Sequence, residues 1–138
     1  MTRQGDRFDH VAVAVLDIEV ARDYFSAVLG LPVVGDEIAD APGVRLVYLD
    51  AGNTFLQLVQ PVRPGPVSAW LDEHGEGLHH VCIATERIED VLDSIPGEGD
   101  SPVFLGGRGR RACFLTREEF GVKIELTEHE PIEQKESA

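Results

Sequence analysis

The sequence predicts an α+β fold in which two βαβββ modules follow one another along the chain. The first observation is a repeat of a strand-like run that carries a histidine. Segment 8–14 contains His10, and segment 78–84 contains His80, which is 70 residues further on. The same offset continues through further matching pairs, which are Ala14 and Ala84, Ile18 and Ile88, and Glu19 and Glu89.

The second observation is another pair of matching segments, 55–59 and 123–127. Each has one polar residue between apolar neighbours, Gln57 in the first and Glu125 in the second. Their offset is 68, so the second copy has lost two residues between its paired segments. The two copies therefore place two histidines, a glutamine and a glutamate at equivalent positions.

The first module is predicted as β-α-β-β-β. Segment 8–15 is rich in valine, which is typical of a strand buried on both faces. Asp17 is a good N-cap for a helix with apolar residues at helical spacing, and Gly30 can close it. The further extended segments are 31–34, 44–49 and 54–59, with a hairpin turn at 50–53. The acidic segment 36–43 ends in Ala41-Pro42-Gly43, so we expect a loop or an irregular edge there.

The second module repeats this order after a linker. Three prolines lie within 61–66, and a short helix is expected over 67–71, ending near His74. The strands expected in module two are 78–84, 103–105, 112–116 and 122–127, and its helix is 88–95. We therefore expect a single domain over 1–138, with module one at about 7–60, the linker at 61–76, module two at about 77–130, and a disordered tail at 131–138.

Composition excludes several classes of function. The formal net charge of -13 argues against a nucleic-acid partner, because phosphates need a basic surface. No apolar run is long enough for a membrane span, and the N-terminus lacks the apolar segment of a signal peptide. Cys82 and Cys113 lie in apolar strands without disulfide-framework spacing, which indicates buried, reduced thiols in a cytoplasmic protein.

One basic cluster stands out in this acidic chain, comprising Arg108, Arg110 and Arg111. The simpler interpretation is a solvated hairpin loop. The alternative is a contact for the phosphate of a long ligand tail.

The four repeated polar residues are candidate metal ligands. Alternation along a strand places His10 on one face with Ala12 and Ala14, and His80 on one face with Cys82 and Ala84. The small residues should leave a cavity, while the valines and isoleucines of the opposite face should pack against the helices. His79 should point away from His80 and serve packing or a hydrogen bond.

An approximate twofold relation between the modules would bring His10, Gln57, His80 and Glu125 together. Two imidazoles, an amide oxygen and a carboxylate suit Co²⁺, Mn²⁺, Mg²⁺, Ni²⁺, Fe²⁺ or Zn²⁺. Each residue taken alone is more simply interpreted as an ordinary strand residue that faces solvent, and it is the symmetry of the four that favours a shared site.

Several motifs together resemble the vicinal oxygen chelate superfamily, which includes glyoxalases, dioxygenases and bleomycin-resistance proteins. They are Asp9-His10-Val11-Ala12, Asp23-Tyr24-Phe25, Gly52-Asn53-Thr54, Gly77-Leu78-His79-His80 and Gly121-Val122-Lys123-Ile124-Glu125. The similarity is greatest to the methylmalonyl-CoA epimerases. This resemblance implies an open, eight-stranded, barrel-like sheet around a metal held by His10, Gln57, His80 and Glu125, and a homodimer.

The resemblance also implies an activity, the inversion of the carbon between a thioester and a carboxylate. One base removes the proton and a second group returns it on the other face. Glu125 is one expected catalytic group. The glutamate that such epimerases carry two residues before a glycine is replaced by Ala41, so we expect Asp40, or else Glu37, to supply the second base.

Two alternatives remain open at this stage. One is another metal-dependent member of the superfamily, a glyoxalase-type lyase or a dioxygenase with His10, His80 and Glu125 as a facial triad. The other is a ligand-binding protein of the same fold without catalysis. Loss of the glutamate at Ala41 favours these alternatives, whereas retention of all four ligands disfavours a binding-only protein.

Overall fold

The computed structural model describes residues 6–40 and 42–130, which divide into two compact units. One unit comprises residues 10–79, and the other comprises residues 80–130 together with 6–9. The predicted disordered tail, 131–138, lies outside the described residues, as does Ala41. Within the described part of the chain, no helix combines the length and the apolar character that a membrane span requires.

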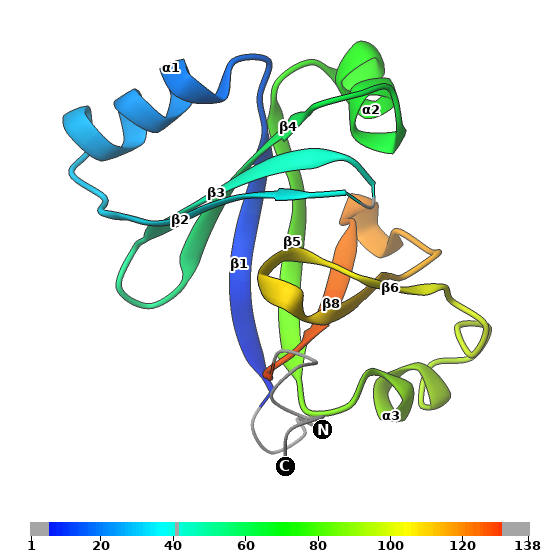
Figure 1. Cartoon of the computed structure of the whole chain (residues 1–138). Helices are drawn as coiled ribbons and strands as arrows, with labels where there is room; N and C mark the ends of the chain where they lie inside the picture. Colours follow the sequence, from blue (N-terminus) through cyan, green and yellow to red (C-terminus); the bar gives the residue numbers. More distant parts are fainter. Residues whose placement is uncertain (1–5, 41, 131–138) are drawn as a thin grey trace. The chain divides into compact units, whose positions relative to one another are not determined.

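The first module contains four strands and two α-helices (Figure 1). In chain order they are β1 (Arg7–Ala14), α1 (Ile18–Asp23), β2 (Val33–Ala39), β3 (Val44–Asp50), β4 (Phe55–Pro61) and α2 (Pro66–His74). The strand order is β2-β3-β4-β1, in which β1 runs parallel to β4 and the other neighbours are antiparallel. This is the predicted βαβββ order, followed by α2, the short helix that the sequence predicts near the end of the linker.

The second module repeats that order. Its elements are β5 (Gly77–Thr85), α3 (Ile88–Asp93), β6 (Val103–Leu105), β7 (Arg111–Phe114) and β8 (Ile124–Glu128). The strand order is β5-β8-β7-β6, again with one parallel pair, β5 and β8, and antiparallel neighbours elsewhere. The predicted α+β class and its two βαβββ modules are confirmed.

Helix α1 begins where the sequence predicts. The Asp17 carboxylate accepts hydrogen bonds from the backbone N–H groups of Glu19 (3.1 Å) and Val20 (3.3 Å), which lack partners within the helix. The helix continues as a π-helical turn over Tyr24–Val28. It ends at Gly30, whose φ of +82° suits glycine and stops the helix there.

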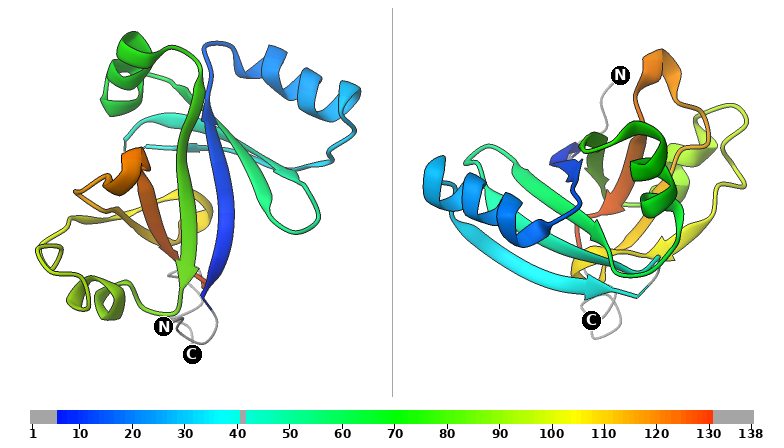
Figure 2. Two further views of the ribbon diagram at one scale, coloured as in Figure 1. Left: turned by 180° about the vertical axis from the view of Figure 1, so that it is seen from behind. Right: turned by 90° about the horizontal axis from the view of Figure 1, so that it is seen from above.

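The two helices of the first module cover opposite faces of its sheet (Figure 2). Ile18 of α1 packs with Leu58, with Val13 of β1 and with Val15 just after that strand, on the face predicted to contact a helix. Helix α2 packs Val67 and Leu71 against the alanine face. In the second module, α3 packs its apolar residues against β7 and β8, where Cys113 and Leu126 are completely or almost completely buried.

The prediction of a loop or irregular edge over 36–43 is correct in placing an edge there but wrong about irregularity in its first half. Strand β2 continues to Ala39 and pairs in antiparallel register with β3, with Glu37 opposite Leu46 and Ala39 opposite Val44. Asp36 is held on the outer face by Arg45, whose Nε and Nη2 lie 3.0 and 2.7 Å from its carboxylate oxygens. This ion pair stabilises an acidic strand, and only Asp40–Gly43, as far as it is described, forms the turn.

Candidate metal centre

In the first module, Gln57 and His10 lie beside the same tyrosine. Gln57 Nε2 donates a hydrogen bond to Tyr48 Oη at 3.0 Å, and the rings of His10 and Tyr48 lie edge to face with centroids 6.2 Å apart. All three side chains are at least 95% buried. Because Tyr48 engages the amide nitrogen, the hydrogen bond fixes the orientation of the Gln57 amide and leaves its carbonyl oxygen as the acceptor end.

The strand register explains why these side chains share a face. Ala12 of β1 lies opposite Gln57 of β4, and Gln57 lies opposite Tyr48 of β3. Residues opposite one another in a sheet project to the same side, and His10 is two residues before Ala12. The period-two alternation in the sequence therefore predicts the face shared by His10 and Ala12, and the register adds Gln57 to that face.

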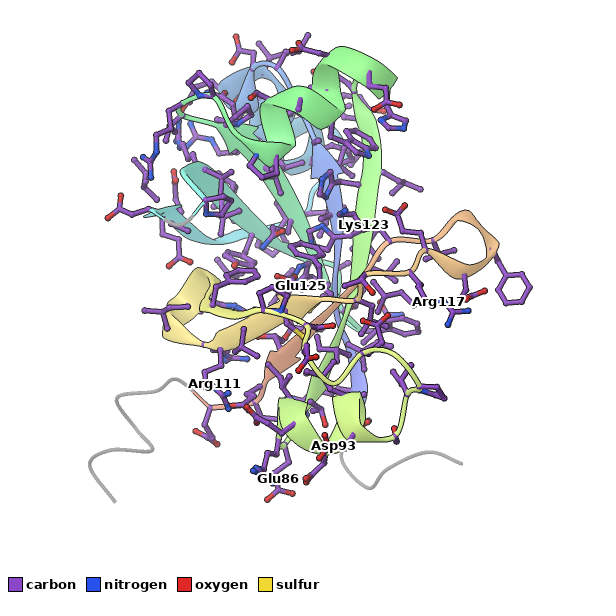
Figure 3. All side chains as sticks on the ribbon, turned by 90° about the vertical axis from the view of Figure 1, so that its right-hand side faces the viewer. Glu86, Asp93, Arg111, Arg117, Lys123 and Glu125 are labelled. Carbon is purple, nitrogen blue, oxygen red and sulfur yellow. The ribbon has the colours of Figure 1, made fainter. Side chains whose placement is uncertain are left out.

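In the second module, His80 and Glu125 form a buried pair. His80 Nε2 lies 3.1 Å from Glu125 Oε1, and both residues are at least 90% buried. Glu125 projects from β8 in Figure 3 and lies opposite both Cys82 and Phe114. The Phe114 ring packs edge to face on His80 at 5.1 Å and stacks with Phe104 at 6.0 Å.

The two modules thus use the same positions in the same way. Gln57 and Glu125 occupy matching places in β4 and β8, and their neighbours Tyr48 and Phe114 occupy matching places in β3 and β7. A buried carboxylate and buried imidazoles are costly unless each is paired or binds an ion. The buried nitrogen and oxygen donors in these residues fit a divalent cation of the borderline or hard type.

The alanine face of β1 is covered by a helix in the first module. Ala12 and Ala14 are fully buried, and Val67 and Leu71 of α2 pack in the same cluster with residues of β3. The small side chains therefore serve close packing of a helix on the sheet. His79 packs against Trp70 of α2, with ring centroids 4.9 Å apart, in agreement with its predicted packing role.

Two helix-capping residues lie at matching positions of the two modules and are not predicted above. Gln60 Oε1 accepts a hydrogen bond from Ile18 N at 2.7 Å, and Glu128 Oε2 accepts one from Ile88 N at 3.1 Å. Each lies three residues after a candidate ligand, and the two are 68 residues apart, the same offset as between Gln57 and Glu125. The sequence signal for these two capping residues is the 68-residue offset, which pairs Gln60 with Glu128 as it pairs Gln57 with Glu125.

The arginine cluster of the second module is not a solvated loop. Arg108 donates to the buried carboxylate of Asp9, and Arg110 Nη1 lies 3.7 Å from the other oxygen of Asp9. Arg111 Nη1 lies 2.9 Å from Glu128, and its Nη2 pairs with Glu89, which lowers the pKa of Glu89 to about 2. The side chains of all three arginines are less than a third exposed.

The cysteines match their prediction as free, buried thiols. Burial raises the pKa of Cys82, and the nearby negative charges of Glu125 and Asp9 raise it further. Burial also raises the pKa of Cys113 to about 11. Neither thiol is a ready nucleophile or a thiolate ligand near neutral pH.

Paired βαβββ modules, each with two buried polar residues at the same strand positions, define a class of α+β proteins suited to holding a divalent ion. A profile of the Glyoxalase/Bleomycin resistance protein/Dioxygenase superfamily matches residues 9–114. The chain belongs to that superfamily.

The relatives point to a narrower group. The chain is 31% identical over 132 residues to the uncharacterized Bacillus subtilis protein YqjC, with 89% of this chain and 92% of YqjC covered. It is 32% identical over 129 residues to mitochondrial methylmalonyl-CoA epimerase of Mus musculus, covering 87% of this chain and 71% of the relative. A variant of Streptomyces coelicolor methylmalonyl-CoA epimerase in complex with 2-nitronate-propionyl-CoA superposes with a TM-score of 0.77 at 30% identity, covering 88% of this chain and 93% of the epimerase.

Proposed function

We propose that this protein is a metal-dependent epimerase that acts on methylmalonyl-CoA or a similar 2-acyl thioester. The observation that carries the proposal is the buried His80–Glu125 pair, matched at repeat-equivalent positions by His10 and Gln57. Relatives at about 30% identity that are named methylmalonyl-CoA epimerases support the choice of reaction.

We propose His10, Gln57, His80 and Glu125 as the ligands of one divalent ion. Their donors suit Co²⁺, Mn²⁺, Mg²⁺, Ni²⁺, Fe²⁺ or Zn²⁺. When bound, such an ion supplies Lewis-acid stabilisation of negative charge on an oxygen of the substrate. Tyr48 contributes by fixing the amide of Gln57 so that its oxygen, and not its nitrogen, is available to the ion.

The remaining work falls to side chains of this chain. Inversion at a carbon acidified by a thioester requires one group that removes a proton and another that returns it on the opposite face. We assign Glu125 to one of these roles. Phe114 and Phe104 stack beside the His80–Glu125 pair. Their apolar rings help to exclude water, which would otherwise protonate either face of the substrate carbanion.

The second proton-transfer group belongs to the first module in this proposal. The sequence favours Asp40. Asp40 lies in the turn after β2, it is exposed, and its backbone carbonyl accepts a hydrogen bond from Arg63. Cytoplasmic location and a homodimeric state also belong to this proposal, and light scattering at high micromolar protein concentration tests the dimer.

Proton exchange tests the activity directly. The protein is stripped with a chelator, loaded with each of the six ions in turn, and incubated in D₂O with methylmalonyl-CoA or ethylmalonyl-CoA. We expect mass spectrometry to show one deuterium entering at C2 with at least one ion and none with the chelator. His80→Ala should abolish the exchange, and His74→Ala, which alters an exposed histidine, should leave it unchanged.

Absence of exchange with every ion and both thioesters would reject the epimerase. That result would leave a lyase or dioxygenase of the same superfamily, or a ligand-binding protein. Calorimetric titration with Co²⁺ or Mn²⁺ separates these outcomes from loss of the metal site. If the protein binds the ion but shows no exchange, the metal site is supported and only the epimerase reaction is rejected.

A further inference from the structure

Glu37 lies in the middle of β2, a strand that sequence analysis expected to be irregular. Strands β2 and β3 lie side by side in Figure 1, and their register pairs Gly35 with Tyr48, Glu37 with Leu46 and Ala39 with Val44. Glu37 is partly buried, whereas its neighbours Asp36 and Ile38 are exposed. This alternation places Glu37 on one defined face of the sheet.

That face is the one that carries the candidate ligands of the first module. Leu46 and Tyr48 are two residues apart on β3, so they project to the same side, and Tyr48 is bonded to Gln57. Ala39 packs in the same cluster as Leu46, Tyr48 and Ala12. Asp36, on the opposite face, is engaged by Arg45 beside α1.

Glu37 and Gln57 lie on the two strands that flank β3. Strands β2 and β4 are separated by β3, which sets their backbones roughly 10 Å apart. The position level with Tyr48 on β2 is Gly35, where a Cβ atom would lie 3.2 Å from Tyr48 Cδ2. The ring of Tyr48 thus lies over a residue without a side chain, and Glu37 is the nearest residue of β2 on this face with a carboxylate.

The second module does not repeat this carboxylate. Ala112 of β7 corresponds to Leu46 of β3, since each is two residues before the aromatic partner of its ligand. The residue opposite Ala112 is Phe104, which therefore corresponds to Glu37. The backbone of the module does not need an acid there. The carboxylate is a feature of one module only, as expected of a group that acts on one face of a substrate.

We propose that Glu37, and not Asp40, is the proton-transfer group of the first module, a proposal that rests on the epimerase function above. The C2–H bond of the thioester breaks and its proton passes to the Glu37 carboxylate. The electron pair of that bond moves into the thioester carbonyl as an enolate. A proton from the other group then forms the new C–H bond on the opposite face, and the reverse reaction exchanges the two roles.

Deuterium exchange from the two epimers, assayed separately, tests the assignment. In wild-type protein, both (2R)- and (2S)-methylmalonyl-CoA should exchange C2–H in D₂O. Glu37→Gln should lower epimerisation about 10²–10⁴-fold. It should also abolish exchange from one epimer while the other still exchanges, because the group on the other face still removes and returns its own proton. The change should appear in kcat, with KM within about threefold of wild type.

Matched variants separate a chemical role from a structural one. Asp36→Asn removes the adjacent carboxylate on the opposite face and should keep both exchange rates within twofold of wild type. Glu37→Gln should also bind Co²⁺ with wild-type affinity in calorimetry and melt within a few degrees of wild type. Asp40→Asn tests the alternative assignment, in which Asp40 is the proton-transfer group.

Three results would overturn the assignment. Equal loss of exchange from both epimers in Glu37→Gln would show a general structural effect. Selective loss from one epimer in Asp40→Asn, with wild-type rates in Glu37→Gln, would assign the base to Asp40. Absence of exchange in the wild type itself would reject the proposed function, and with it the role of Glu37.

Discussion

Gln60 and Glu128 hold the same position in the two modules, and each accepts a hydrogen bond from the first residue of its module's helix. The acceptor oxygens lie 2.7 Å from Ile18 N and 3.1 Å from Ile88 N. The last strand of each module thereby fixes the start of the helix that follows the first strand. This connection joins elements that are 40 or more residues apart in the chain.

Removal of one of these acceptors should weaken the fold. Gln60→Leu leaves the partly buried Ile18 N–H without its partner, and we expect the free energy of unfolding to fall by about 1–2 kcal/mol. Urea denaturation followed by circular dichroism measures the loss. Asp72→Asn, an exposed change on α2, is the control and should stay within about 0.5 kcal/mol. Equal stability of the two variants would contradict the capping role.

The Tyr48 hydroxyl should raise the affinity of the site for a metal, although it is not a proposed ligand. Tyr48→Phe keeps the ring beside His10 but releases the Gln57 amide, so we expect Co²⁺ or Mn²⁺ affinity to fall about 10–100-fold in calorimetric titration. Tyr24→Phe removes the hydroxyl of an exposed tyrosine and is the matched control. Unchanged affinity in Tyr48→Phe would show that Gln57 does not depend on this bond.

Metal binding itself should depend on both modules. Glu125→Gln removes the carboxylate of the buried pair, and Gln57→Leu removes the amide oxygen of the other module, so each should weaken Co²⁺ binding by at least 100-fold. Glu118→Gln, an exposed change, should bind as wild type does. If Gln57→Leu binds normally while Glu125→Gln does not, the ion is held without the first module's amide.

The buried carboxylate of Glu98 should make stability depend on pH in the acid range. Ser101 Oγ donates to it at 2.6 Å, as do Thr116 N at 3.0 Å and Arg117 N at 3.3 Å, and these bonds lower its pKa from 4.5 to about 2. A lowered folded-state pKa stabilises the fold fully above about pH 4.5, and this contribution is lost as pH falls towards 2.

Glu98→Gln tests that contribution. The amide cannot accept from all these donors, so we expect a loss of about 1–3 kcal/mol at pH 7 and a smaller loss of stability than wild type between pH 5 and 3. Urea midpoints measured across that range give both quantities. Glu73→Gln, on the exposed surface of α2, should keep the pH dependence of the wild type. Parallel pH curves for Glu98→Gln and wild type would contradict the assignment.

The buried thiols should resist modification in the folded protein. Burial raises the pKa of Cys113 to about 11, and Cys82 is completely buried. At pH 8 we expect both to react with a thiol reagent at least 100-fold more slowly than in denaturant. Rapid labelling of one cysteine in the native protein would reveal local opening of its strand.

The parts of the fold that the sequence predicts are those with local signals. Period-two alternation and the 70-residue repeat place His10 and His80 on strands, and Asp17 marks the start of α1. Strand β2 is not predicted by local patterns, because its acidic residues and the following Pro42-Gly43 are typical of a loop. Its partner Arg45 acts across the sheet and not along the chain.

The environment of the candidate site was harder to predict for the same reason. The residue that orients Gln57 is Tyr48, a cross-strand neighbour that looks like an ordinary apolar strand residue in the sequence. The packing of α2 on Ala12 and Ala14 likewise depends on where a helix beyond the last strand of the module returns to the sheet. Both are consequences of register and topology, which no local pattern encodes.

The pairing of Asp9 with Arg108 and Arg110 has a consequence for attempts to produce the second module as a separate fragment. Residues 7–9 begin β1, the first strand of the first module, but belong to the unit that contains the second. A fragment that starts at the linker would keep the two guanidinium groups and lose the buried carboxylate between them. A circular permutant opened near Val62, with its original ends joined, would retain that counter-charge. We therefore expect permutation to be tolerated where simple truncation to one module is not.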